Sequence, residues 1–417
     1  MHLAPTGRQQ RLRAELRSYF REVMPEGAPS DPGARRALLR RIGRDGMLGI
    51  GWPEEYGGQG RGPDEQFVFF DEAYRAGAPV SMVTLNTVGP TLMKHGTPQQ
   101  REYFLPRILR GELVFAIGYS EPSAGTDLAS LRTRAVRAEG AHSAEGAHSA
   151  EGAHSAQGAH SAQEVGGADG DGEWLIDGQK IFTSNAQHAD WIWLACRTDT
   201  EAPKHRGISI LLVPTDVPGF SWTPIETVGG LTTTATYYDG IRVPAGNLVG
   251  EENAGWGLIT HQLNHERVAL AAIGMQAEDA FSRALAHART PDPDTGEKPG
   301  DRPWVRAALA QAHARLAAVR LLNWRLVGDV GAGTLAPGDA SGVKFVGTES
   351  AVAVYQLCQE VVGDAGLVRA GSPGAFGDGE LERMNRAAQI NTFGGGVSEV
   401  QREIVATMRL GMRRGKR

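Results

Sequence analysis

Apolar positions in the first quarter of the chain recur at intervals of three and four residues. The segments RLRAELRSYFREVM and DEQFVFFDEAYRAG show this spacing, and Gly or Pro stands near their ends. An interval of three to four residues is typical of an amphipathic helix, because it returns apolar side chains to one face. We therefore expect a helical N-terminal domain over residues 1–112.

The pattern changes at Leu113 and changes back after Gly250. Between them, short runs rich in Ile, Val, Trp and Thr are bounded by Gly and Pro, as in ADWIWLACRTD and RGISILLVPTD. Such runs are typical of strands and predict a compact antiparallel β domain over residues 113–249. The helical interval then returns in long segments, which predict a C-terminal helical bundle over residues 250–417. The fold class expected is α+β multidomain.

Composition narrows the class of protein. The chain has 417 residues, 41% of them hydrophobic, and a formal net charge of -5. This charge gives no electrostatic case for nucleic acid or for an acidic membrane surface. Two cysteines cannot form a metal or disulfide framework, the N-terminus lacks an apolar signal core, and no apolar run reaches about 18 residues. We expect a cytoplasmic multidomain enzyme without a metal.

A low-complexity segment interrupts the β domain at residues 138–166. The hexad A-E/Q-G-A-H-S begins at Ala138 and repeats four times, so that a histidine recurs every six residues. Metal capture by these histidines and a hexapeptide solenoid are two conceivable interpretations. The segment has no Val, Ile or Leu until its last residues, and its Gly, Ala and Ser content is typical of a flexible excursion. We expect a disordered hairpin loop with no catalytic role.

The stretch from Phe115 to Leu131, FAIGYSEPSAGTDLASL, carries the clearest candidate chemistry. An apolar strand leads directly into Ser120, and a turn from Ser123 to Asp127 follows. This arrangement presents backbone N–H groups, hydroxyls and a glycine on one edge. It suits an extended polar ligand better than a packed core.

A single carboxylate interrupts an apolar helical stripe after Gly255. The residues Ile259, Leu263, Glu266, Leu270 and Ile273 are spaced four, three, four and three apart. Glu266 should therefore point inward. It is either a structural carboxylate paired with an arginine or a general base whose pKa is raised by an apolar substrate, and the spacing alone leaves both open.

In these motifs the chain resembles the flavin-dependent acyl-CoA dehydrogenases. Their flavin pocket carries a block of the form aromatic-x-x-Ser/Thr-Glu-Pro-x-x-Gly-Ser/Thr-Asp, and the resemblance continues in order along nearly the whole chain. It implies the acyl-CoA dehydrogenase fold, with an N-terminal helical domain, a middle antiparallel β domain and a C-terminal helical bundle. It also implies FAD as cofactor, removal of an α-proton from an acyl-CoA thioester, and transfer of the β-hydrogen as hydride to flavin N5.

The resemblance also selects the base. Most members carry the catalytic glutamate in a Tyr-Glu-Gly-Thr block near the C-terminus, where this chain has Gly395. A minority branch, which includes the isovaleryl-CoA and long-chain enzymes, supplies it from a Leu-x-x-Glu-Arg block, and Leu263 to Arg267 matches that block. Glu266 is therefore the expected base. His265, its neighbour, is expected to turn away from the inward stripe.

Other positions acquire expected roles through the same resemblance. The backbone N–H of Gly395 and a flavin ribityl hydroxyl are expected to stabilise the thioester oxygen during proton removal. Substrate is expected at Thr126, Asn264 and Arg267, the last two along the pantetheine channel. The residues expected to bind the flavin are Tyr119, Ser120, Gly125, Thr126, Phe182, Ser184 and Glu399.

The chain departs from the family where homotetrameric members hold the ADP part of a neighbour's flavin. An Arg-x-x-Phe-Gly block is missing, Glu360 stands in place of a clamp glutamine, and Val397 replaces a threonine. In these departures and in the motifs it keeps, the chain is similar to the base-bearing subunit of actinobacterial heterotetrameric steroid side-chain acyl-CoA dehydrogenases. That similarity implies a second, unlike subunit, with a homo-oligomer as the alternative, and a bulky or steroid acyl-CoA.

Electron-transfer flavoprotein is the expected electron acceptor, as is common in the family. Two other functions stay open at this point. The chain could be a flavoenzyme of this family that acts on a carrier-protein-bound or non-CoA substrate, or a non-catalytic partner subunit. The second alternative predicts loss of the base and of the flavin turn, and the sequence retains both.

Overall fold

The computed structural model describes residues 5–138, 172–262, 275–293 and 295–413. Backbone contacts divide the chain into two compact units. We call residues 1–82, 226–231 and 263–417 the helical unit, and residues 83–225 and 232–262 the sheet unit. The helices expected in residues 1–112 divide between these two units. The domain limits of the sequence analysis stay a prediction.

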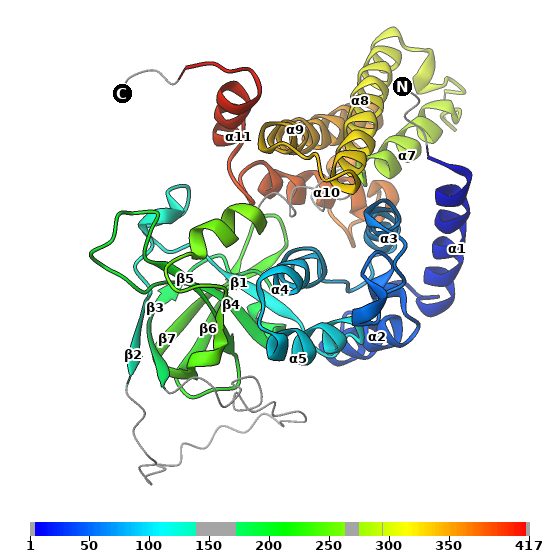
Figure 1. The fold of residues 1–417 in the computed structure, drawn as a ribbon. Helices are drawn as coiled ribbons and strands as arrows, with labels where there is room; N and C mark the ends of the chain where they lie inside the picture. The colour runs from blue at the N-terminus through cyan, green and yellow to red at the C-terminus, as the bar shows by residue number, and fades with distance from the viewer. Residues whose placement is uncertain (1–4, 139–171, 263–274, 294, 414–417) are drawn as a thin grey trace. The chain divides into compact units, whose positions relative to one another are not determined.

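The sheet unit is built on eight strands with the order β6-β7-β3-β2-β4-β5-β8, and β1 pairs with β4 off this path (Figure 1). Two helices, α4 (Gly89–His95) and α5 (Pro98–Leu109), precede the sheet. The strands are β1 (Phe115–Gly118), β2 (Arg134–Ala138), β3 (Glu173–Lys180), β4 (Trp191–Arg197), β5 (Ile208–Pro214), β6 (Phe220–Glu226), β7 (Thr232–Pro244) and β8 (Leu248–Val249).

Most strand pairs in the sheet are antiparallel, as expected, and two are parallel. β2 pairs antiparallel with β3, β3 with β7, β4 with β5, and β5 with β8. However, β1 runs parallel to β4, with Phe115 opposite Trp191, and β2 meets β4 in a single parallel pair. A parallel pair needs a long connection. Here the chain between β1 and β4 contains β2 and β3, and it returns β4 alongside β1 in the same direction.

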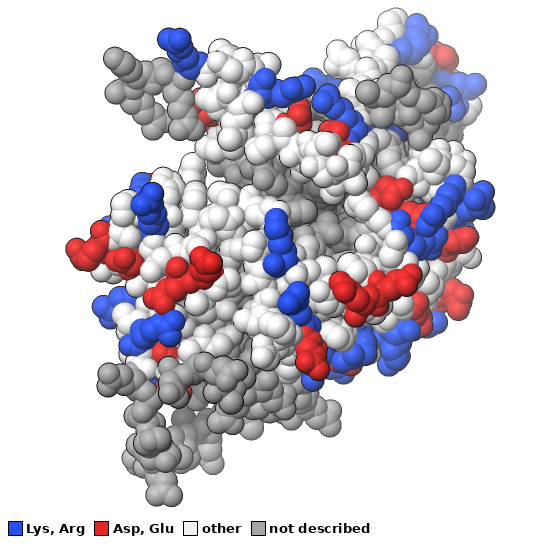
Figure 2. Space-filling model, viewed as in Figure 1, with Lys and Arg blue, Asp and Glu red and all other residues white. Residues whose placement is uncertain are grey.

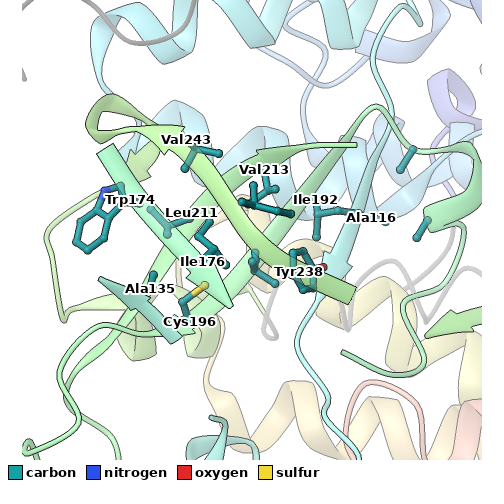
Figure 3. Close-up of a cluster of buried hydrophobic side chains, with 14 residues drawn as sticks. Ala116, Ala135, Trp174, Ile176, Ile192, Cys196, Leu211, Val213, Tyr238 and Val243 are labelled. Carbon is teal, nitrogen blue, oxygen red and sulfur yellow. The ribbon is translucent and has the colours of Figure 1, made fainter. Parts of the chain in front are cut away.

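The strands β4 and β5 are buried along their whole length. A strand covered on both faces shows a continuous apolar run instead of alternation, which explains WIWLACR and ISILLVP. Figure 3 shows their side chains packed with those of neighbouring strands. The labelled members of this core are Ala116, Ala135, Trp174, Ile176, Ile192, Cys196, Leu211, Val213, Tyr238 and Val243. A rigid core of this kind fixes the ends of β1 and β3.

The low-complexity segment connects the strands of one hairpin. β2 ends at Ala138 and β3 begins at Glu173, and these two residues are opposite each other in the antiparallel pair. The rest of the repeat, with the expectation that it forms a disordered loop, lies outside the described residues.

The helical unit contains two groups of helices. The first comprises α1 (Gly7–Val23), α2 (Pro32–Arg44) and α3 (Pro63–Arg75). The second comprises α7 (Ala277–Arg289), α8 (Pro303–Gly331), α9 (Pro337–Val362), α10 (Glu380–Ala388) and α11 (Ser398–Ile404), followed by a π-helical turn, η12 (Val405–Arg409). Alanines at the contacts of α7, α8 and α9 let these helices pack closely. Among the described residues, no helix is long and apolar enough to cross a membrane.

Ion pairs hold α1 against α3. Asp71 and Glu72 are almost completely buried, a position that carboxylates occupy only when they are paired. Arg13 contacts both, at 2.5 Å from the Asp71 carboxylate, and Arg17 lies 2.8 Å from Glu72. Arg75 pairs with Asp71 and also with Glu278 of α7, at 2.8 and 2.9 Å. The pairs thus join the two helix groups of this unit.

Candidate active site

The turn after β1 is held by its own backbone. The N–H of Glu121 donates to the carbonyl of Ala124 at 2.9 Å, and the N–H of Ala124 donates back to Glu121 at 3.0 Å. Gly118 is the last residue of β1, and a larger residue would not fit there because a Cβ would lie only 2.9 to 3.1 Å from the Leu194, Ile192 and Tyr238 side chains. The turn therefore starts from a fixed point in the core.

Beyond Ala124 the turn is open to solvent. Gly125 and Thr126 are exposed, and within the described part of the chain their N–H groups donate to no protein acceptor. A Cβ on Gly125 would meet nothing within 4 Å, and its φ is not positive. Neither packing nor backbone conformation therefore requires a glycine here. The open space around Gly125 leaves room for a ligand to approach the backbone from outside.

A buried ion pair lies beneath this turn, and the sequence analysis missed it. The Glu121 carboxylate accepts hydrogen bonds from the N–H groups of Arg132 and Thr133 at 2.7 and 2.8 Å, and from Lys180 Nζ at 2.9 Å. Lys180 Nζ also donates to the carbonyl of Tyr119 at 3.1 Å. Burial lowers the pKa of Lys180. Burial opposes ionisation of Glu121 as well, but Lys180 and the Thr133 donors outweigh it and hold the pKa of Glu121 below its ordinary value.

The second expected flavin block follows Lys180 directly. The N–H of Ile181 donates to the carbonyl of Ser120 at 2.8 Å, which joins the two blocks. Phe182 has a φ of 59° and an exposed fraction of 61%. A non-glycine residue at positive φ costs roughly 1–3 kcal/mol. An exposed aromatic ring held at that cost is the kind of outlier that marks a ligand site.

Hydroxyl groups support the Phe182 turn from β7. The N–H of Thr183 donates to the Thr234 carbonyl at 2.9 Å, and Thr234 Oγ1 donates to the Thr183 carbonyl at 2.6 Å. Ser184 is exposed, with its Oγ 3.4 Å from Thr233 Oγ1. The structure therefore brings Tyr119, Ser120, Phe182 and Ser184 to one edge of the sheet unit.

Tyr119 also belongs to a buried polar chain. Its hydroxyl accepts a hydrogen bond from Trp193 Nε1 at 3.2 Å and donates to Gln262 Oε1. Gln262 is 1% exposed and lies in the helix that begins at Gly255, which the structure describes up to this residue. The expected base, Glu266, and its neighbours Asn264, His265 and Arg267 lie outside the described residues. Their expected roles therefore stay predictions.

The C-terminal glycine block lies in the helical unit. Gly395 and Gly396 have φ values of 64° and 100°, which favour glycine. Lys344 of α9 is buried, and its Nζ donates to the Gly396 carbonyl at 2.6 Å. Within the described residues the N–H of Gly395 donates to no protein acceptor, so it is available to a ligand. Glu399, in the first turn of α11, is exposed.

The supporting residues missed in the sequence left only weak signals. Glu121 stands inside the motif, and Lys180 is the one cation at the end of an otherwise suitable strand. Lys344 is the only basic residue of α9. A lone charge in an apolar setting indicates a buried partner, but the partner's identity depends on tertiary contacts.

Three sequence profiles of one family match the chain. They are described as the N-terminal, middle and C-terminal domains of acyl-CoA dehydrogenase, and they match residues 6–112, 151–239 and 253–410. The chain belongs to the acyl-CoA dehydrogenase family. The protein is accordingly an oxidoreductase that acts on the CH–CH group of acyl-CoA, and it uses FAD. The fold class expected from the sequence is confirmed.

Individual relatives are similar over their full length. This acyl-CoA dehydrogenase is 45% identical to acyl-CoA dehydrogenase FadE26 of Mycobacterium tuberculosis, with 100% of both chains covered. Among solved structures it is similar to the Tcur3481-Tcur3483 steroid ACAD, with a TM-score of 0.86, 48% identity and 100% of both chains covered. It is also similar to a chain of the ChsE4-ChsE5 complex from Mycobacterium tuberculosis, with a TM-score of 0.84, 44% identity and 100% of both chains covered.

Proposed function

We propose that this acyl-CoA dehydrogenase introduces an α,β double bond into a bulky CoA thioester, with Glu266 as the base. The observation that carries the proposal is the exposed Phe182 at positive φ, joined through the Ile181–Ser120 hydrogen bond to the turn that carries free amides. An aromatic face, exposed hydroxyls and free N–H groups on one edge fit a flavin. When bound, FAD accepts a hydride from the β-carbon.

The residues of the turn and of the second block would hold this cofactor. The free N–H groups of Gly125 and Thr126 suit phosphate or carbonyl oxygens, and Thr126 also serves the substrate. Phe182 and Ser184 would lie against the ring system, with Tyr119 and Ser120 at its polar edge. Glu399, exposed in the first turn of α11, is the acidic member of this set.

Proton removal needs a base and a donor to the thioester oxygen. An α-proton is too weakly acidic for a carboxylate to remove unless the developing oxyanion is stabilised by donors already in place. The N–H of Gly395 makes no hydrogen bond to the described residues and lies in a turn that Lys344 holds. Because Gly395 replaces the usual C-terminal glutamate, the carboxylate of Glu266 is the group assigned to accept the α-proton.

The substrate class rests on the relatives. One similar structure is described as a steroid ACAD, and its likeness extends over the full length of both chains. We therefore propose a steroid side-chain or similarly bulky acyl-CoA, with Asn264 and Arg267 along the channel for its pantetheine arm. Electrons would pass to an electron-transfer flavoprotein.

A second, unlike subunit completes the proposal. The chain lacks the arginine block and has Glu360 in place of the glutamine that hold the ADP part of FAD in homotetramers. Glu360 is exposed near the end of α9. Similar chains occur in complexes whose descriptions name two components, Tcur3481-Tcur3483 and ChsE4-ChsE5. The partner would supply the missing arginine.

Anaerobic reduction of the flavin tests the activity and the base together. Acyl-CoA thioesters of increasing size are added to the flavin-loaded enzyme, and loss of flavin absorbance is followed. Glu266→Gln should keep the flavin and the fold but lower the reduction rate on the order of 1000-fold, because a positioned general base is removed. Arg11→Gln, at an exposed position of α1, is the control and should reduce at the wild-type rate. Near-normal reduction by Glu266→Gln would disprove the assignment of the base.

A further inference from the structure

Gln262 carries a buried amide nitrogen that no described protein group satisfies. The residue is 1% exposed, and within the part of the chain that the structure describes its Nε2 has no hydrogen-bond partner. Burying an amide without a partner costs about 1–3 kcal/mol, and an acceptor on a bound ligand would offset this cost.

The neighbouring hydrogen bonds fix which end of the amide is free. Trp193 Nε1 can only donate, and it donates to the Tyr119 hydroxyl at 3.2 Å. The same hydroxyl donates to Gln262 Oε1, so the amide oxygen is the end of the side chain that faces Tyr119. The opposite end of the side chain is the NH2 group, which presents two donors.

Trp193 and Gln262, the two ends of this hydrogen-bonded chain, are buried, and Tyr119 between them is half-buried. Trp193 is 0% exposed in the middle of β4, and the carbonyl of Tyr119 is held by Lys180 Nζ at 3.1 Å. Tyr119 adjoins Ser120 in the proposed flavin turn, and Gln262 precedes Glu266 by four positions in the sequence. A separation of four predicts a shared face wherever both residues are helical.

We propose that the Gln262 amide nitrogen donates a hydrogen bond to a neutral oxygen of the bound ligand. This inference rests on the proposed function, and the acceptor is either a carbonyl of the flavin ring or an oxygen of the acyl substrate. The amide oxygen already accepts a hydrogen bond from Tyr119, so the NH2 group is the end of the side chain that can bond to the ligand. Gln262 thereby selects an oxygen acceptor at its position and disfavours a purely apolar group, which would leave the donors unpaired.

Gln262→Glu is one test, because it keeps an acceptor for Tyr119 and replaces the NH2 group with a carboxyl oxygen, which also adds a charge when it is ionised. Gln262→Met is the second variant, since it removes the acceptor and the donors and leaves no buried charge.

The two variants are made in the flavin-loaded enzyme, in the assembly that it forms. One arm measures the FAD dissociation constant and the flavin spectrum without substrate, and the other measures kcat/KM for the acyl-CoA that wild type oxidises best. Thr260→Val is the matched control, because Thr260 is exposed on the same helix and, among the described residues, its hydroxyl bonds only to carbonyls of that helix.

The expected loss is about tenfold in one arm for both variants, and less than twofold for the control. Weaker FAD binding or a shifted spectrum identifies the flavin as acceptor, whereas a loss confined to kcat/KM identifies the substrate. Changes below twofold in both arms overturn the inference. If wild type neither binds nor oxidises any acyl-CoA, the proposed function fails on its own. If, in addition, the Gln262 variants bind FAD as tightly as wild type, then neither flavin nor substrate is the acceptor, and this inference is overturned as well.

Discussion

At the scale of single residues, the candidate site is a set of costly local features. Phe182 keeps a positive φ although glycine would adopt it more easily, and its ring is exposed. Lys180 and Glu121 are charged groups inside a core, where an apolar pair would often be at least as stable. Destabilising local features of this kind are common at functional sites, where ligand binding and not stability determines the residue. Both can be tested by substitution.

Replacing Phe182 with glycine should separate stability from flavin binding. Glycine adopts positive φ without the strain of roughly 1–3 kcal/mol, its larger loss of backbone entropy offsets part of that gain, and the exposed ring contributes little burial, so the flavin-free chain should be at least as stable as wild type to within about 1 kcal/mol. FAD affinity should fall at least about tenfold, because the aromatic face is lost. Thermal unfolding and flavin titration measure the two effects. Phe104→Ala, at a fully buried ring, should instead cost about 3–5 kcal/mol. Unchanged FAD affinity in Phe182→Gly would remove Phe182 from the site.

Replacing Glu121 with glutamine should destabilise the sheet unit in a pH-dependent way. The folded pKa of Glu121 lies below its ordinary value of 4.5, so its contribution is complete above that value and is lost as pH falls through the folded pKa. At pH 7 the variant should lose about 3 kcal/mol, because the buried Lys180 keeps no charged partner among the described residues. The difference from wild type should shrink below pH 4.5. Denaturation at several pH values measures it.

The control for this prediction is Glu173→Gln, which breaks the exposed pair between Glu173 and Arg242. An exposed pair contributes only about 0–1 kcal/mol, so this variant should stay close to wild type at every pH. Equal stability of Glu121→Gln and Glu173→Gln at neutral pH would show that the buried pair is not a structural support of the turn.

At the scale of elements, the sequence predicts what depends on local pattern. The strands β4 and β5 were predictable because burial on both faces produces a continuous apolar run. Helices such as α1 were predictable because their apolar positions recur at intervals of three and four residues. The parallel pairing of β1 with β4 was not predictable, since it depends on where the chain returns after β2 and β3. The same limit applies to the site. Motif residues could be named, but Lys344 and Gln262 acquire their roles only through contacts between distant segments.

At the scale of the whole molecule, the charged side chains in view are of both signs. Figure 2 shows basic and acidic side chains interspersed over the face in view, in keeping with the net charge of -5. The family and the order of helices, sheet and helices could be predicted from the sequence, because motifs are spread along the chain. The assembly could be inferred only from missing residues.

The chain alone should bind FAD weakly. Without the arginine block, and with Glu360 in place of the clamp glutamine, it lacks the residues that hold the pyrophosphate and adenine in homotetramers. A carboxylate at that position would also repel the pyrophosphate.

Co-expression with a second acyl-CoA dehydrogenase-like chain that carries the arginine should give a heterotetramer with one flavin per unlike pair, since each pair has one base-bearing site. Flavin that binds only the assembled state should raise its Tm in proportion to the logarithm of FAD concentration. The native mass and the number of bound flavins, measured for the chain alone and for the co-expressed pair, distinguish a homotetramer from a heterotetramer. A homotetramer of this chain with four tightly bound flavins would mean that its own residues form the clamp, and the unlike partner would then be unnecessary.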